Sequence, residues 1–422
     1  MTQDKKCYDC IVIGGGAAGM TAAITASGHG ANVAIIEHTK RLGNKILQTG
    51  NGKCNFTNRY MDLSMYQNED KETVKNVLSR FDSDSVIEFF RGLGVYTRER
   101  NGYVYPHSET AASVNDALRL EIENQKTAVY TECEVLAVRY ESGCFFIKTT
   151  SGCMYAQKLI LATGSKAAPK SGSDGSGYEL ARQFGHKIKK PLPALVQLVS
   201  SNPYCKAMAG VRSTGTARLY IDGAFAAEDT GEIQYTDYGI SGIPVFQLSR
   251  HAVLALDKGR SVNICVNMLN DISVETLYQD IENRFYKSGS KTVEQYFSGI
   301  VNKKLVYAAG KTANVDVSKT VADTGAKGLQ KIVDSLACFG FDITGSKGFE
   351  QAQVCQGGVC LNEVDKYTLE SKLCPGLYFA GEILDVDGKC GGYNLQWAWS
   401  SGYVAGFNAA ENNAEDFLWR RK

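Results

Sequence analysis

Six residues near the N-terminus, Gly14 to Gly19, have the spacing G-x-G-x-x-G of a phosphate-binding turn. Glycines at these places permit a tight turn and close approach of the backbone to a pyrophosphate. The free amides and the positive end of a helix that begins there then stabilise the phosphate charge. Glu37 follows about twenty residues later, where a carboxylate can accept hydrogen bonds from ribose hydroxyls. The alternative is an ordinary tight turn and an unrelated surface acid, and the joint pattern favours a dinucleotide site.

Three later segments indicate that the dinucleotide is FAD. The apolar run Leu159 to Leu161 ends in Ala162-Thr163-Gly164, and the run Leu377 to Ala380 ends in Gly381-Glu382. The acid of the second segment, Glu382, can form hydrogen bonds with the ribityl or pyrophosphate region of FAD. Gly391 to Leu395 then opens the last helix, whose amides and dipole can face the flavin N1–C2=O edge. Each segment alone is compatible with a strand-end turn, but their order along the chain favours FAD.

The elements around these motifs predict an α/β fold. Cys7 to Ile13 and Asn32 to Ile36 are apolar, β-branched strands separated by a helix from Ala17 to about Ser27. This order is a βαβ unit with a parallel sheet. Further helices are predicted over 74–93 and 113–123, and strands over 131–139, 144–149 and 154–161.

After Pro191 short strand-like pieces replace the alternation of strand and helix. We therefore expect a Rossmann-type FAD-binding domain over 1–190 and 346–422, interrupted by a β-barrel-like domain. The inserted β-rich domain is expected over 191–272 and 320–345, with a nested small helical module over 273–319.

Composition narrows the class of protein. With 422 residues the chain is long enough for two or three domains, and its net charge of +1 gives no electrostatic reason to expect nucleic acid or an anionic membrane as partner. No apolar run reaches the roughly 20 residues of a membrane span, and the polar start does not resemble a signal peptide. The 13 irregularly spaced cysteines predict reduced thiols and a cytoplasmic location. The five scattered histidines predict no metal site. Nothing indicates the oligomeric state.

Longer motifs resemble those of a known flavoprotein family, which includes the BaiN-type bile-acid reductases and the aminoacetone oxidases. They are Arg41 to Lys45, Thr49 to Asn58, Ala162 to Tyr178, Tyr238 to Gly242, and Tyr378 to Asn394. The resemblance covers essentially the whole chain and implies the same interrupted FAD domain. Two positions depart from the family pattern: Lys53 stands where arginine is common, and Asp237 where histidine is frequent.

The motifs and the resemblance together give a set of expected cofactor contacts. The residues expected to contact FAD are Gly14, Gly15, Gly16, Ala17, Ala18, Gly19, Glu37, Arg41, Lys45, Asn55, Val135, Ala162, Thr163, Gly164, Gly381, Glu382, Gly392, Tyr393, Asn394 and Leu395.

Absent motifs restrict the chemistry. Cys54 has no second cysteine within the next four positions, so a dithiol relay is not expected, and a buried structural thiol is the alternative to a place in the substrate cleft. Only one dinucleotide fingerprint follows a strand, so NAD(P)H, as a transient reductant, would have to visit the same flavin face as the substrate. Tyr393 is the candidate proton donor, with plain packing as its alternative. Tyr235 and Tyr238 are candidates for lining the substrate cleft.

We expect an FAD-dependent oxidoreductase that transfers hydride from flavin N5 to an activated C=C bond, an enone of a small or steroid-like substrate. One alternative is an amine oxidase of aminoacetone type that uses O₂. Another is a flavin-binding accessory protein without turnover, including an accessory factor in RNA modification. Fold and cofactor do not decide among these functions, because unrelated substrates are handled on one fold.

Overall fold

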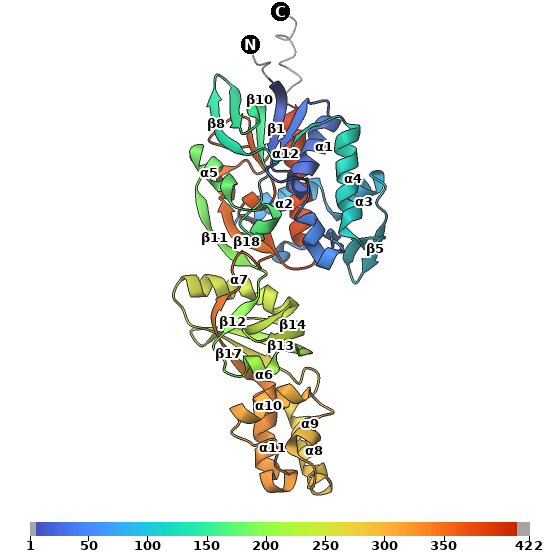
Figure 1. The fold of residues 1–422 in the computed structure, drawn as a ribbon, viewed down its shortest axis with the longest axis vertical. Coiled ribbons are helices and arrows are strands. Elements are labelled where there is room, and N and C mark those ends of the chain that lie inside the picture. The colour runs from blue at the N-terminus through green and yellow to red at the C-terminus, as the bar shows by residue number, and fades with distance from the viewer. Residues whose placement is uncertain (1–5, 412–422) are drawn as a thin grey trace, which may run out of the picture. The chain divides into compact units, whose positions relative to one another are not determined.

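The computed structural model describes residues 6–411. The chain divides into two compact units (Figure 1). The first unit takes in the chain up to Leu192 and again from Val354, and the second runs from Pro193 to Gln353.

The first unit is built on a seven-stranded sheet of Rossmann type, which confirms the predicted fold class. Its strands lie in the order β7 (Ala128–Tyr130), β2 (Val33–Ile36), β1 (Lys6–Ile13), β10 (Gly152–Leu161), β9 (Cys144–Thr149) and β8 (Val135–Glu141), with β19 (Leu377–Phe379) also paired to β10. The pairs β1–β2, β1–β10, β2–β7 and β10–β19 are parallel. The carboxyl ends of β1, β10 and β19 therefore lie at one edge of the sheet, and each leads directly into one of the predicted cofactor segments.

Two helices rich in small residues pack against each other beside this sheet, α1 (Ala17–Gly28) and α12 (Tyr393–Glu411). A Cβ atom on Gly402 would lie 2.4 Å from the carbonyl oxygen of Ala18, and one on Gly406 would lie 2.3 Å from that of Ala22. The small residues of α12 therefore let its backbone approach α1 closely. This packing joins the two ends of the sequence in one domain.

The remaining elements of the first unit surround the sheet. They are β3 (Thr57–Asn58), β4 (Tyr66–Gln67), α2 (Lys71–Arg80), α3 (Ser83–Gly92), β5 (Thr97–Arg100), β6 (Tyr103–Pro106), α4 (Ala111–Asn124), α5 (Ser176–Gln183), β11 (Ile188–Ala194), β18 (Val354–Val359) and β20 (Asp387–Gly388). The single helix expected over 74–93 is in fact two helices, because Asp82 caps a new one by accepting from the Ser85 amide at 2.8 Å. The β5–β6 hairpin was not predicted.

The second unit is a closed antiparallel barrel with added helices. Its strands lie in the order β12 (Leu198–Ser200), β15 (Gly239–Gly242), β14 (Ala224–Thr236), β13 (Arg212–Ile221), β16 (Val262–Asn267) and β17 (Phe339–Ser346), and β17 closes on β12. Its helices are α6 (Cys205–Met208), α7 (Ile243–Asp257), α8 (Val274–Arg284), α9 (Val293–Phe297), α10 (Lys303–Thr312) and α11 (Val321–Ala337). The barrel confirms the expected β-barrel-like insertion.

Two details of this unit differ from the sequence-based expectation. The helical module was expected to end at 319, but helix α11 continues it to Ala337. The helical pattern of α11 is hidden in the sequence because Gly325 and Gly328 are weak helix formers. The expectation of reduced thiols throughout is wrong at Cys265 and Cys338, which form a disulfide. Cys265 lies in β16 and Cys338 directly precedes the neighbouring strand β17, which brings their Cα atoms to 5.2 Å. Because 73 residues separate them in sequence, the pairing could not be read from spacing. The other 11 cysteines are free thiols.

Within residues 6–411, no helix has both the length and the apolar character needed to cross a membrane.

Candidate functional site

The turn from Gly14 to Gly19 leaves open space at one glycine and packs tightly at two others. A Cβ atom on Gly14 would lie 2.5 Å from the carbonyl oxygen of Ala162, and one on Gly19 would lie 1.9 Å from that of Gly14. At Gly16 a Cβ atom would meet nothing within 4 Å. Gly16 is the N-cap of α1 and no side chain caps the helix there, so the first amides of α1 remain available to an anion.

Glu37 follows β2 and is held against this turn. One of its carboxylate oxygens accepts from the Gly15 amide at 2.7 Å and the other from the Thr39 amide at 2.8 Å. A carboxylate has about four lone-pair sites, so both oxygens can still accept from ribose hydroxyls. The structure thus brings Glu37 and the glycine turn together, as predicted from their spacing.

A cavity of about 890 Å³ opens directly after Glu37. It is lined by His38, Thr39, Lys40, Arg41, Asn44, Glu132, Glu134, Thr150 and Lys170. The predicted contact Arg41 is fixed here by donating from Nε to Asn44 Oδ1 at 2.8 Å. Val135 begins β8 immediately after Glu134 of the lining.

The segment after β19 meets the start of α1. A Cβ atom on Gly381 would lie 2.8 Å from that of Ala18, which places the two predicted segments in contact. Lys45 Nζ lies 2.5 Å from Glu382 Oε2, and Ser165 donates to the same oxygen at 3.1 Å. The predicted residues Lys45 and Glu382 are therefore one ion pair, and Ser165 joins it from the loop after β10.

The glycines before α12, Gly391 and Gly392, lie against strand β3. A Cβ atom on Gly392 would lie 2.5 Å from the carbonyl oxygen of Thr57, and the side-chain Nδ2 of Asn58 donates to the Gly391 carbonyl at 2.9 Å. Asn394 is engaged locally, accepting from the Gly388 amide and donating to the Gly388 carbonyl, both at 2.8 Å. Gly391 and Gly392 adopt positive φ values of 121° and 93°, a conformation that favours glycine at these two positions.

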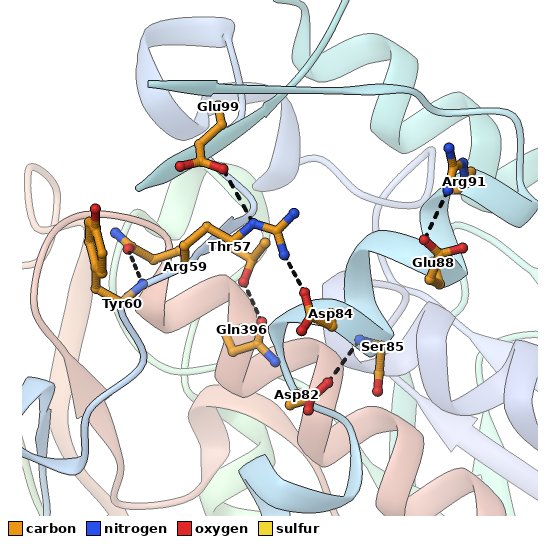
Figure 2. A network of polar contacts seen from close by, with 11 residues as sticks. Thr57, Arg59, Tyr60, Asp82, Asp84, Ser85, Glu88, Arg91, Glu99 and Gln396 are labelled. Atoms are coloured by element: carbon orange, nitrogen blue, oxygen red, sulfur yellow. Dashed lines mark hydrogen bonds and ion pairs between the residues drawn. The ribbon is translucent and has the colours of Figure 1, made fainter. Parts of the chain in front are cut away.

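Several buried residues that position these segments were not identified from the sequence. Trp397 Nε1 donates to the Gly381 carbonyl at 3.2 Å, and Trp399 Nε1 donates to the Phe56 carbonyl at 2.8 Å. Figure 2 shows a third such contact, in which the Thr57 hydroxyl donates to Gln396 Oε1 at 2.5 Å. Helix α12 therefore holds segments on both sides of the site. The available signal was the run of polar and aromatic residues within an otherwise small-residue helix.

These features fit FAD on structural grounds. The open space at Gly16 and the uncapped amides of α1 suit a pyrophosphate, and the cavity beside Glu37 suits an adenosine. Gly391 and Gly392 have positive φ and directly precede α12. Backbone amides at this helix start would suit the edge of the flavin ring. Thr163, by contrast, has its hydroxyl buried against Gly177 with no hydrogen-bond partner among the described residues.

Three predicted residues have their polar groups turned into the protein. With its side-chain oxygen and nitrogen assigned to suit their neighbours, the Asn55 side-chain amide donates to the carbonyl oxygens of Thr57 and Val104 at 2.9 and 3.1 Å and stabilises the loop. Cys54 is fully buried, and burial raises the pKa of its thiol to about 12, so it does not line an accessible cleft. Tyr393 is buried too, and its hydroxyl donates to the Tyr60 carbonyl at 3.1 Å.

The two tyrosines predicted for the substrate cleft lie in the barrel unit. Tyr235 is fully buried, packs against Phe341 and accepts a hydrogen bond from Ser213 at 3.4 Å. The expectation that it lines a cleft is wrong because its side chain is not exposed: Tyr235 is a core residue of the barrel, and burial raises its pKa to about 12. Tyr238 is only half-buried, in the turn between β14 and β15, with Lys347 Nζ 4.6 Å from its ring centroid.

Known proteins match this chain over nearly its whole length. The profile described as HI0933-like protein Rossmann domain matches residues 8–408. A 3-dehydro-bile acid delta(4,6)-reductase of Clostridium scindens is 42% identical over 403 residues, which cover 95% of this chain and 98% of the relative. A ribosomal RNA dihydrouridine synthase of Escherichia coli is 31% identical over 403 residues, which cover 94% and 96%.

Among solved structures, a 3-ketosteroid delta1-dehydrogenase from Sterolibacterium denitrificans is similar in fold alone. It shares 11% identity at a TM-score of 0.50, over 97% of this chain and 100% of that one. The profile match spans almost the whole chain, and the structure brings together the glycine turn with Glu37 and Lys45 with Glu382. The chain thus belongs to the HI0933-like Rossmann-domain family and is an FAD-dependent oxidoreductase.

Proposed function

We propose that the protein reduces a C=C bond conjugated to a carbonyl group in a small, steroid-like acid, with NAD(P)H as the reductant. The observation that carries the proposal is the 42% identity to a 3-dehydro-bile acid delta(4,6)-reductase over 95% of the chain. That name places a ketone at carbon 3 of the steroid and reducible double bonds at carbons 4 and 6. Hydride addition to such a bond places negative charge on the carbonyl oxygen, which must be stabilised.

The second group of relatives supports the same reaction class. Dihydrouridine is uridine whose ring C=C bond, conjugated to a carbonyl, has been reduced. The two activities named for the relatives therefore share one chemical step on different substrates. Reduction of ribosomal RNA is accordingly our second candidate function, favoured by the 31% identity to the Escherichia coli synthase.

The residues of this chain would bind and orient rather than carry electrons. Bound FAD supplies the hydride chemistry. The α1 amides and Glu37 would hold its pyrophosphate and ribose, and the start of α12 would face the edge of the ring. Tyr393 stays our candidate proton donor, although its hydroxyl would first have to leave the Tyr60 carbonyl. Tyr238 stays a candidate for contact with the substrate.

Anaerobic stopped-flow spectroscopy of the FAD-loaded protein tests the proposal. NADH or NADPH should bleach the flavin, and a 3-oxo-4,6-diene steroid acid should then restore its colour with formation of the reduced steroid. Restoration only by unmodified ribosomal RNA would favour the second candidate. Bleaching by aminoacetone without NAD(P)H would favour an amine oxidase, and no response to any of these would favour an accessory protein.

The order of binding gives a further test. The sequence contains one dinucleotide fingerprint, so NAD(P)H and acceptor would have to use the same flavin face in turn. Initial-rate plots against NAD(P)H at several acceptor concentrations should be parallel. Intersecting lines with a stable ternary complex would contradict a shared face.

A further inference from the structure

The three-stranded sheet β3–β6–β5 presents one face with an unusual combination of charge and aromatic rings. In antiparallel pairs, directly opposite residues lie on the same face. Arg98 lies opposite Tyr105 and Arg100 opposite Tyr103, while Asn58 of β3 also lies opposite Tyr103. We call this set, with Lys53 and Glu109, the Tyr–Arg face.

This face carries an excess of positive charge. Arg98 Nη1 lies 3.2 Å and Lys53 Nζ 3.7 Å from the Glu109 carboxylate, and Arg100 also contacts it. Three cations thus share one carboxylate, which leaves two positive charges without a matching acid within residues 6–411. Their side chains are 43%, 50% and 55% exposed for Arg98, Lys53 and Arg100. Solvent-exposed donors of this kind remain able to bind a further anion.

The opposite face of the sheet packs against the interior of the protein. Val104 and Thr57 are buried, and the Thr57 hydroxyl donates to Gln396. Arg59, next along the chain from β3, pairs with Asp84 of α3 and with Glu99 of β5, as Figure 2 shows. Arg59 is therefore neutralised by two acids, whereas the three cations of the Tyr–Arg face share the single carboxylate of Glu109.

The Tyr–Arg face connects directly to the start of α12. The side-chain Nδ2 of Asn58 donates to the Gly391 carbonyl at 2.9 Å, and a Cβ atom on Gly391 would lie 2.7 Å from the Tyr103 ring. Tyr103 is exposed and Tyr105 half-buried, so their rings offer apolar surface between Gly391 and the cations. Gly391 at the start of α12 therefore adjoins Tyr103, and Arg100 and Arg98 lie opposite Tyr103 and Tyr105 on the same face.

We propose that the Tyr–Arg face is the binding site for the anionic end of the substrate: an apolar body lies along Tyr103 and Tyr105, and its carboxylate binds Arg98, Arg100 and Lys53. Arginine suits this role because its planar fork can hold both oxygens of a carboxylate. Glu109 orients the three cations and limits their charge in the absence of ligand. The inference rests on the proposed function for the identity of the ligand.

Equilibrium binding tests the site without requiring turnover. A saturated cholanoic acid and its methyl ester would be titrated into the FAD-loaded protein, with Kd read from tryptophan fluorescence. The double variant Arg98→Gln/Arg100→Gln should weaken binding of the acid by about tenfold or more, because charge-assisted hydrogen bonds are lost. Its affinity for the ester should be unchanged. Glu109→Gln should act in the opposite direction and tighten binding of the acid.

Arg91→Gln is the matched control, because Arg91 is an exposed arginine on α3 that pairs with Glu88 three residues before it on the same helix. Flavin absorbance and the melting temperature verify that each variant is folded. Equal losses for acid and ester, or no loss for either, would overturn the proposal. The proposal would also fail if the double variant lost affinity for NADPH alone and not for NADH, because the cations would then bind the 2′-phosphate of NADPH. A loss of affinity confined to a uridine-containing RNA oligonucleotide would overturn it as well. Acid binding through this face without enone reduction would contradict the proposed function and leave the site standing.

Discussion

The indole nitrogen of Trp399 donates to the carbonyl oxygen of Phe56 at 2.8 Å, and both residues are fully buried. Two residues earlier on the same helix, and so on a different face of it, Trp397 donates to the Gly381 carbonyl. Helix α12 thus uses two neighbouring tryptophans to fix two different segments, one before β3 and one after β19. The positions of Thr57 and Asn58, and through Asn58 that of Gly391, depend on this arrangement.

Replacing each tryptophan by phenylalanine should separate these two roles. Trp399→Phe leaves the Phe56 carbonyl without its donor and should cost about 1–3 kcal/mol of stability. Because the loop before β3 loses its support, turnover should fall while FAD affinity changes little. Trp397→Phe should mainly weaken FAD binding through Gly381. Thermal unfolding, FAD titration and steady-state kinetics on both variants check this, and the same pattern of defects in both would refute separate roles.

Gly16 offers a substitution that should disturb the ligand and not the protein. A Cβ atom there meets nothing within 4 Å, and φ of −80° is open to any residue. Gly16→Val should therefore fold with a melting temperature near that of the apoprotein yet fail to retain yellow FAD. In contrast, Gly19→Val should fail to fold, because its side chain would collide with the Gly14 backbone. Soluble, yellow Gly16→Val protein would remove the main argument for a pyrophosphate at this turn.

The sequence predicts the cofactor half of the site better than the substrate half. The glycine turn and Glu37 obey local spacing rules, so their meeting could be expected. The Lys45–Glu382 pair joins residues 337 positions apart, and only the shared sheet edge brings them together. Tyr235 reads as a cleft residue, but strand alternation in β14 turns it into the barrel. The β5–β6 hairpin was missed because its exposed, charged first strand lacks an apolar pattern.

The Lys45–Glu382 ion pair should contribute to FAD affinity. Both side chains are mostly buried, and Ser165 adds a hydrogen bond to the same carboxylate oxygen. Glu382→Gln keeps the shape but removes the charge, leaving Lys45 without its partner. We expect FAD binding to weaken by about 1–3 kcal/mol, roughly fivefold to 150-fold. Glu179→Gln, on the exposed surface of α5, is the control and should leave the FAD dissociation constant unchanged.

His186 should make the first unit sensitive to acid. Its Nε2 lies 2.7 Å from Ser371 Oγ and its Nδ1 3.3 Å from Glu363. Burial lowers its pKa, against the opposing effect of Glu363. Below pH 6.5 the unfolded chain therefore binds protons more readily than the folded chain does. The free energy of unfolding should fall as the pH drops through this window.

Chemical denaturation at pH 5 to 8 checks this effect. His186→Gln should be less stable than the wild-type protein at pH 8 because it loses the contacts to Ser371 and Glu363. Its stability should change less between pH 6.5 and 5. Parallel pH profiles for the two proteins would show that His186 does not titrate in this way.

Tyr393→Phe decides whether the first residue of α12 supplies a proton. Burial raises the pKa of its hydroxyl, so the group stays protonated at neutral pH. Its ring is held edge-on against Tyr66, with 5.9 Å between ring centroids. If the hydroxyl donates the proton, reoxidation of the flavin by the enone should slow by about 100-fold or more, while reduction by NAD(P)H changes little.

Tyr66→Phe is the matched control for Tyr393→Phe. It removes another buried hydroxyl from the same pair of rings, one that donates to the Tyr393 carbonyl at 3.1 Å. Both variants lose one hydrogen bond to a backbone carbonyl and should lose about 1 kcal/mol of stability. A proton donor would make Tyr393→Phe differ from this control only in the enone half-reaction. If both variants slow both half-reactions equally, Tyr393 packs against the site, and the proton comes from another group.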